Sequence, residues 1–270
     1  MSLMKPEENT HESLVQDFSL QVLGILTASA AGDPTGISAA VIPIIVREVF
    51  RQVINPLTTR GESKRLYQWG KQAAEGIAQR SNAGEEFRKD GFFEETPTNR
   101  SNFEEVVEST LKTVMAATEE PKVKFMANLT ENVHFDEDLD MDTYRQILKD
   151  IDELTYRQLC IIRLATLYEK RKIIGHIDDE KWEEQIPQNE RARFHSISRD
   201  FEEMMVDESY LDGVRGMKTE EGEPCMFRPS LAHRTYQAKR LYSFANLCEI
   251  SIEDIVEMFS LWNVRPRKSE

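Results

Sequence analysis

Cysteine is scarce in this chain, and its placement excludes the structures that cysteines usually build. Only three occur among 270 residues (Cys160, Cys225 and Cys248), and no two of them form a CxxC pair. Structural zinc sites and disulfide frameworks both depend on closely spaced or evenly numbered cysteines. The sequence therefore predicts neither, and it fits a reducing compartment such as the cytoplasm.

Local catalytic motifs are also missing. The sequence contains no HExxH, GxSxG, P-loop or GxGxxG pattern, and these are the short motifs that most directly indicate chemistry. A catalytic triad is defined by geometry, so an enzyme assembled across the fold stays open. We assign no catalytic and no cofactor-binding residue, and the balance is against an enzyme.

Basic residues are outnumbered. The formal net charge is −14, and the segment from Glu85 to Glu153 holds 19 acidic and 8 basic residues, a net charge of −11. Such a segment repels phosphate backbones, which argues against nucleic acid as the main partner. An acidic, solvated surface is the simpler interpretation.

Charge almost disappears between Asp17 and Arg47, where Asp33 is the one charged residue. Small residues recur there at every fourth position, and they form a candidate interaction surface: Gly24, Ala28, Gly32, Gly36 and Ala40. This spacing lets two helix backbones approach closely, in membranes or in any tightly packed pair.

The apolar segment is interrupted by Gly32, Asp33 and Pro34, which favour a helix end followed by a new helix start. We expect helices over about 13–31 and 34–54, with Pro43 kinking the second. Each uncharged half has only about 13–15 residues, fewer than the ~20 that span a bilayer. A buried helical hairpin is the first interpretation, and a hairpin that inserts into a membrane is the alternative.

Hydrophobic periodicity predicts a mainly α fold, with more than half of the residues in helices and under a tenth in strands. Further helices are expected over about 62–80, from Ser101, from Pro121 to about His134, and over 156–170, 193–207, 231–248 and from Ser251. The 156–170 helix is apolar on nearly every side and should be central, with Leu159, Ile162 and Ala165 buried. The helix from Ser101 presents one apolar stripe: Phe103, Val106, Val107, Leu111, Val114 and Met115.

The predicted organisation has five parts, separated by turn-forming residues. They are a polar leader (1–12), the apolar helical hairpin (13–57), a helical core (58–172), a helix-rich C-terminal subdomain (173–264) and a tail (265–270). Glycines and prolines over 209–229 indicate either a small β-hairpin or an irregular loop.

Two clusters resemble metal sites, and both are incomplete. The run Asp136, Asp138, Asp140 and Asp142 has the alternation of a calcium loop, but an EF-hand that starts at Asp136 needs glycine sixth and glutamate twelfth, where this chain has Met141 and Ile147. We therefore predict no bound metal at this run.

The second cluster is the pair Glu131 and His134, which matches half of a di-iron motif. Glu131 lies off the apolar stripe and should face solvent, and His134 should be an ordinary helix-end residue. The prediction for this pair is again no metal.

Two features of the core have structural interpretations. The loop Asp90–Phe93 places two aromatic residues in a polar stretch, and we expect them to tuck into the core. Arg157 and Arg163 border or interrupt the most apolar helix. Because a buried arginine usually finds a carboxylate, we expect ion pairs with the nearby Asp152 and Glu153.

Several phrases together resemble a group of uncharacterised bacterial proteins. They are Asp90–Phe93, Arg100–Ser101, Lys124–Leu129, Asn132, Phe135–Asp136 and above all the Leu-Thr-Tyr-Arg-Gln-Leu run of 154–159, which follow the small-residue-rich apolar hairpin. The resemblance covers roughly residues 20–168. It implies a bacterial, helical protein and transfers no functional residue.

Three functional hypotheses follow. The first is a non-enzymatic interaction protein that self-associates or binds a protein partner through the apolar hairpin. The second is reversible membrane association by that hairpin, from the cytoplasm. The third is a winged-helix-like regulator in the C-terminal part, which the acidic balance of residues 151–234 disfavours.

Overall fold

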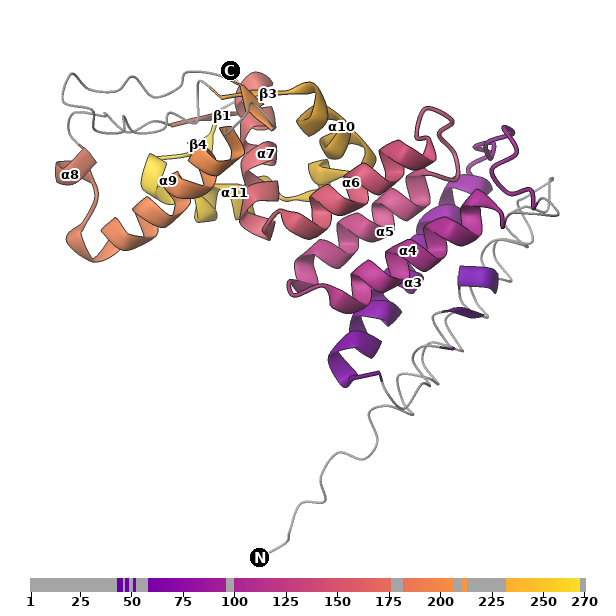
Figure 1. Ribbon diagram of the computed structural model, residues 1–270. Coiled ribbons are helices and arrows are strands. Elements are labelled where there is room, and N and C mark those ends of the chain that lie inside the picture. Colours follow the sequence, from indigo (N-terminus) through magenta and orange to yellow (C-terminus); the bar gives the residue numbers. More distant parts are fainter. Residues whose placement is uncertain are drawn as a thin grey trace, which may run out of the picture. The chain divides into compact units, whose positions relative to one another are not determined.

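The computed structural model describes residues 43–45, 47–48, 51, 58–95, 100–175, 182–205, 210–212 and 232–267 (Figure 1). Helices account for 70% of these residues, and the strands form two antiparallel pairs of two strands each. The prediction of a mainly α protein is confirmed. The described residues of the second hairpin helix, 43–45, 47–48 and 51, are all helical.

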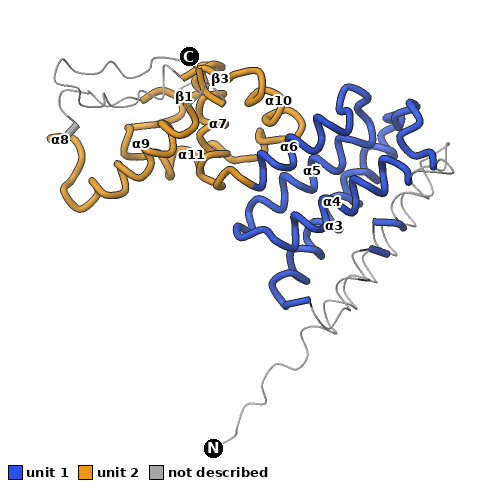
Figure 2. Tube along the Cα trace, viewed as in Figure 1, with its two compact units in different colours: residues 1–152 blue, residues 153–270 orange. Residues whose placement is uncertain are grey.

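The chain divides into two compact units, residues 1–152 and 153–270 (Figure 2). The division falls at the end of the helix that precedes Thr155. The apolar 156–170 stretch, which the sequence interpretation placed within the 58–172 core, therefore belongs to the second unit.

From residue 58 onward, the described part of unit 1 contains four main helices with their apolar faces turned to one core. They are α3 (Arg60–Asn82), α4 (Asn102–Ala116), α5 (Val123–Asn132) and α6 (Met141–Glu153), with a 3-10 turn, η1 (Glu120–Lys122), before α5. The predicted start at Pro121 is thus a 3-10 turn, and α5 proper begins at Val123. Pro121 fits the turn because it fixes its own φ and needs no donor at the first position.

The helix starts of unit 1 are set by local hydrogen bonds. Thr59 and Glu62 form a reciprocal capping box, which begins α3 at Arg60 and not at the predicted residue 62. Ser101 accepts a hydrogen bond from the Glu104 amide and caps α4.

The core of unit 1 combines close backbone approach with one buried polar network. α3 packs most extensively on α5, and Ala73 and Ala74 are fully buried there. Trp69 Nε1 donates to Thr130 Oγ1 at 3.2 Å, and the Tyr144 hydroxyl bonds to Thr110. Burial raises the pKa of Tyr144 to about 12, so this hydroxyl keeps its proton. It also lies 3.4 Å from Thr130 Oγ1 and so joins α6 to α4 and α5 without a charge, while Trp69 links α3 to the same Thr130.

Unit 2 surrounds α7 (Tyr156–Glu169) with several other elements. The helices are α8 (Trp182–Gln185), α9 (Arg191–Met205), α10 (Tyr236–Phe244) and α11 (Ile252–Met258). Three 3-10 turns accompany them: η2 (Gln188–Glu190), η5 (Leu247–Glu249) and η6 (Ser260–Trp262). The helix predicted over 231–248 is shorter, because residues 233–234 form a strand.

Both strand pairs lie in unit 2. Strand β1 (Ile173–Ile174) pairs antiparallel with β4 (Arg265–Pro266), so two residues assigned to the tail belong to a strand pair. Strand β2 (Leu211–Asp212) pairs antiparallel with β3 (His233–Arg234). Strands β2 and β3 flank most of the 209–229 stretch, for which the sequence allowed either a hairpin or a loop.

Helix α7 is central in unit 2, whereas the sequence predicted a central position in the whole fold; the predicted burial of its side chains is confirmed. Leu159 and Ile162 are fully buried and Ala165 is 2% exposed. The helix packs against α9, α10, α11, β1 and β3, and a reciprocal capping box between Thr155 and Gln158 begins it. A helix with neighbours on all sides has no polar face, which explains its uniform apolar sequence.

The predicted ion pairs of α7 are wrong in their partners. Arg157 pairs with Asp200 of α9 and also donates to Ser196. Arg163 donates to the Ile250 carbonyl and to the Tyr242 hydroxyl, and it forms no ion pair with any described residue. Both partners come from elements that pack on α7 within unit 2, and not from the neighbouring residues in the sequence.

Candidate functional site

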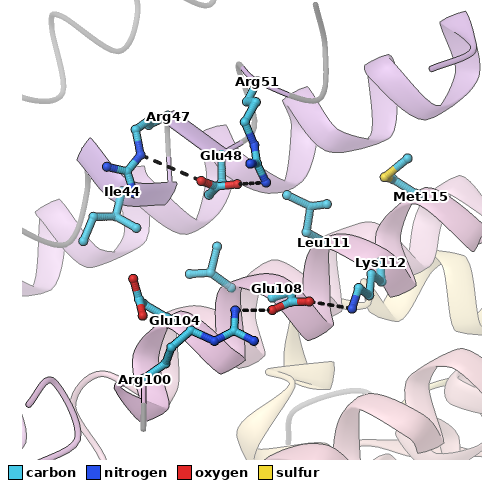
Figure 3. A pocket seen from close by; sticks show the side chains of 11 residues that line it. Ile44, Arg47, Glu48, Arg51, Arg100, Glu104, Glu108, Leu111, Lys112 and Met115 are labelled. Atoms are coloured by element: carbon cyan, nitrogen blue, oxygen red, sulfur yellow. Dashed lines mark hydrogen bonds and ion pairs between the residues drawn. The ribbon is translucent and has the colours of Figure 1, made fainter. Parts of the chain in front are cut away.

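Unit 1 contains a cavity of about 510 Å³ between residues 44–51 and one side of α4 (Figure 3). We call it the α4 cavity. It is lined by Ile44, Arg47, Glu48, Arg51, Arg100, Glu104, Val107, Glu108, Leu111, Lys112 and Met115. Its volume lies within the range of roughly 300–1,000 Å³ that is typical of ligand sites.

Helix α4 is apolar on two sides, and this shapes the cavity. Phe103, Val106 and Val114 belong to its inner side and are buried. Val107, Leu111 and Met115 follow one another at four-residue spacing and line the cavity, opposite Ile44 (Figure 3). A helix with two apolar rows is covered by two different neighbours.

Charged groups at the cavity pair within each wall. On one wall Glu48 lies 2.8 Å from Arg51 and 3.8 Å from Arg47. On the α4 wall Glu108 lies 2.6 Å from both Arg100 and Lys112. No ion pair between described residues crosses from one wall to the other, so separating the walls breaks none of these pairs (Figure 3).

The electrostatics of the α4 wall favour ionised carboxylates. Hydrogen bonds from Lys112 and then Arg100 hold the pKa of Glu108 below its usual value. Glu104 also lines the cavity, and its carboxylate forms no ion pair with a described residue. None of the eleven lining residues is serine, cysteine or histidine.

The predicted interaction surface, Gly24, Ala28, Gly32, Gly36 and Ala40, lies outside the described residues. Its role stays a prediction. The α4 cavity is lined by residues that follow this surface in the chain.

The acidic run at the start of α6 is used locally. Asp136 Oδ1 accepts from the Asp138 amide at 2.9 Å, and Asp140 Oδ1 accepts from the Thr143 amide at 2.7 Å. These bonds form a turn and satisfy a free amide in the first turn of the helix. Within the described ranges, no three His, Cys, Asp or Glu side chains are grouped so that they could hold a metal ion.

The expected exposure of Glu131 is wrong. Its side chain is 16% exposed and lies against α3, where it faces Arg80 at 3.6 Å. Gly76 makes this possible, because a Cβ at that position would lie 1.9 Å from Glu131 Oε2. Arg80 also pairs with Glu85 and lies over the Phe135 ring, so the Glu131 carboxylate belongs to a structural network.

His134 follows the end of α5, but it is fully buried. Its ring lies within about 6 Å of the rings of Phe92, Phe93 and Phe103. Its Nδ1 contacts the Thr130 carbonyl at 2.5 Å, and its Nε2 has no hydrogen-bond partner. Burial lowers the pKa of His134 to about 4, so the ring is neutral near pH 7.

The Asp90–Phe93 loop tucks inward at Phe92, which is 2% exposed. Buried Arg88 fixes the loop: it pairs with Asp90 and donates to the carbonyls of Val133 and Leu139. The hydrogen bond from Arg88 lowers the pKa of Asp90. Phe93 is half-buried, so the loop joins the core mainly through Phe92.

No protein-family model matches this chain, and comparisons with curated proteins and with solved structures give no match either.

The sequence interpretation missed the α4 cavity because it combined two apolar rows of α4 into one stripe. Val107, Leu111 and Met115 repeat every four residues, whereas the inner row of Phe103, Val106 and Val114 does not keep this spacing. A second row of this kind is the signal that could have indicated a second covering partner.

Among the described residues, no helix has both the length and the apolar character to cross a membrane.

Proposed function

We propose that the protein is a non-enzymatic, cytoplasmic interaction protein that self-associates or binds a protein partner through its apolar 13–57 segment, with the α4 cavity as part of the interface. The observation that supports this proposal best is the second apolar row of α4 opposite Ile44. The ion pairs between the charged residues of the α4 cavity stay within each wall, so a partner helix can enter between the walls without breaking these pairs.

The size of the cavity also fits this role. Helix interfaces require side chains of one helix to fill spaces between those of another, and about 510 Å³ of unfilled space accepts several side chains. Charged residues at the rim with apolar residues below resemble the anatomy of protein interfaces.

Light scattering coupled to gel filtration tests the proposal. The wild-type chain should form a defined oligomer, and Met115→Lys should weaken it by placing a charge in the cavity. Ala116→Lys is the matched control, because Ala116 is the exposed neighbour on the same helix. Gly24→Leu and Gly36→Leu should also disrupt folding or oligomerisation.

Membrane association is the alternative, and it requires release of the 13–57 segment from the core. No ion pair between described residues crosses the α4 cavity, and this favours the alternative equally. Liposome flotation separates the two: recovery with vesicles supports the membrane alternative, whereas a defined oligomer in buffer supports the first proposal. A strict monomer that ignores liposomes and tolerates both glycine substitutions would contradict both.

A further inference from the structure

Unit 2 gathers cations around one tyrosine, and this cluster is separate from the α4 cavity. The ring of Tyr242 in α10 has Arg234 Cζ at 4.9 Å from its centre. Arg163 Cζ and Lys170 Nζ each lie 5.9 Å from the same centre. A cation near an aromatic face is a favourable pair, but three cations around one ring repel one another.

One carboxylate compensates only part of this charge. Glu169 accepts hydrogen bonds from Arg234 and lies 2.7 Å from its Nη2. Neither Arg163 nor Lys170 forms an ion pair with a described residue. Among the described residues, the buried Arg163 and the exposed Lys170 are therefore two positive charges without a paired anion.

Arg163 is the residue that general helix electrostatics do not explain. Lys170 caps the C-terminal end of α7, where a cation is favoured by the helix dipole. Arg163 lies mid-helix, is 8% exposed and meets only the neutral Ile250 carbonyl and Tyr242 hydroxyl. Burying a guanidinium without an anion is costly, and its planar set of donors is well suited to a phosphate or carboxylate group.

Two hydrogen-bond donors at this cluster have no acceptor among the described residues. Arg163 donates through Nε and Nη1, which leaves Nη2 without an acceptor among the described residues. The Tyr242 hydroxyl accepts from Arg163, and its own proton has no described acceptor. Burial raises the pKa of Tyr242, so that proton is present at neutral pH.

We propose that Arg163, Lys170 and Tyr242 form a binding site for a phosphate group. A phosphate offers at least three acceptor oxygens and close to two negative charges. These match the guanidinium, the ammonium and the hydroxyl in both number and charge. Arginine also matches the geometry of phosphate oxygens better than a point charge does.

Isothermal titration with inorganic phosphate, at constant ionic strength set by chloride, tests the site. Wild-type protein should bind one phosphate saturably. Lys170→Gln and Tyr242→Phe should each weaken binding about tenfold, because one charge-assisted hydrogen bond is worth roughly that factor. Lys172→Gln is the matched control, since Lys172 is exposed and two residues beyond Lys170, and it should change affinity by less than about twofold.

Glycerol 3-phosphate distinguishes the source of the phosphate group. Tighter binding of the ester than of inorganic phosphate assigns the site to an organic phosphate, and equal or weaker binding assigns it to the free ion; both outcomes support the site. Absence of saturable binding would overturn the proposal. Equal weakening by Lys170→Gln and Lys172→Gln would overturn it too, because it would show diffuse attraction to a basic surface. Circular dichroism checks that each variant is folded, and Lys170→Gln alone is sufficient if Tyr242→Phe does not fold.

Discussion

His134 illustrates how burial sets the chemistry of a single residue in this protein. Sequence spacing placed it at a helix end, where it lies, but did not predict that the ring is buried among three phenylalanines with no solvent contact. Its protonated form would need an acceptor for Nε2–H, and none is present among the described residues. The surroundings therefore favour the neutral ring.

This predicts a specific pH dependence. The pKa of His134 falls from 6.5 to about 4 on folding, so the unfolded chain binds the extra proton first as the pH drops. Stability should decrease between about pH 6.5 and pH 4, by as much as about 3 kcal/mol from this residue. His134→Phe should remove that part of the slope, as measured by urea unfolding at about pH 7 and pH 4.5.

The control for this experiment is His195→Phe, because His195 is exposed on α9. Its pH slope should stay close to that of the wild-type protein. Equal slopes for the wild type and His134→Phe would contradict the assignment.

At the level of elements, the contact between α3 and α5 depends on Gly76. This glycine matters because it leaves space for a side chain, and not because it allows an unusual backbone conformation. Gly76 leaves room for the Glu131 carboxylate, which in turn faces Arg80. Gly61, near the start of the same helix, has only the Arg65 side chain nearby, at an ordinary 3.4 Å. The two glycines therefore form a matched pair.

We expect Gly61→Ala to stabilise the protein by about 0.5–1 kcal/mol, because alanine favours the helix. Gly76→Ala should lose that gain, since the new Cβ displaces Glu131 from Arg80. The difference between the two variants should be about 1 kcal/mol in chemical denaturation. A gain of the same size at both positions would show that Glu131 moves aside without cost.

Helix α7 gives a second prediction at this scale. Leu159 is fully buried, and Leu159→Ala should cost roughly 2–5 kcal/mol through lost packing and a cavity. Ile174→Ala is the control, because Ile174 is 39% exposed on β1, and it should cost less than about 1 kcal/mol. Similar midpoint shifts in urea for the two variants would contradict a central position for α7.

The elements also show what sequence patterns can predict here. Capping residues and apolar stripes are local, so the starts of α4, α7 and α11 and the burial of Leu159 could be read directly from the sequence. The partner of Arg157 could not, because Asp200 lies 43 residues away and only tertiary packing brings it close. The α4 cavity depends in the same way on how residues 44–51 meet Val107 and Leu111.

For the molecule as a whole, the net charge of −14 opposes association between copies. If copies associate through the apolar segment, salt screens this repulsion while leaving hydrophobic contact intact. Raising NaCl from about 10 to 200 mM should therefore strengthen the oligomer in light scattering. Dissociation over the same range would indicate that ion pairs, and not apolar contact, hold the copies together.

Each of the two units also contains a tryptophan that is almost completely enclosed. Trp69 in unit 1 is fully buried and donates to Thr130, and Trp262 in unit 2 is 1% exposed and stacks on Phe194. With Trp182 replaced by phenylalanine, the chain would carry one tryptophan in each unit. Single-tryptophan variants would then emit at short wavelength when folded, and each would report the unfolding of its own unit without any attached dye.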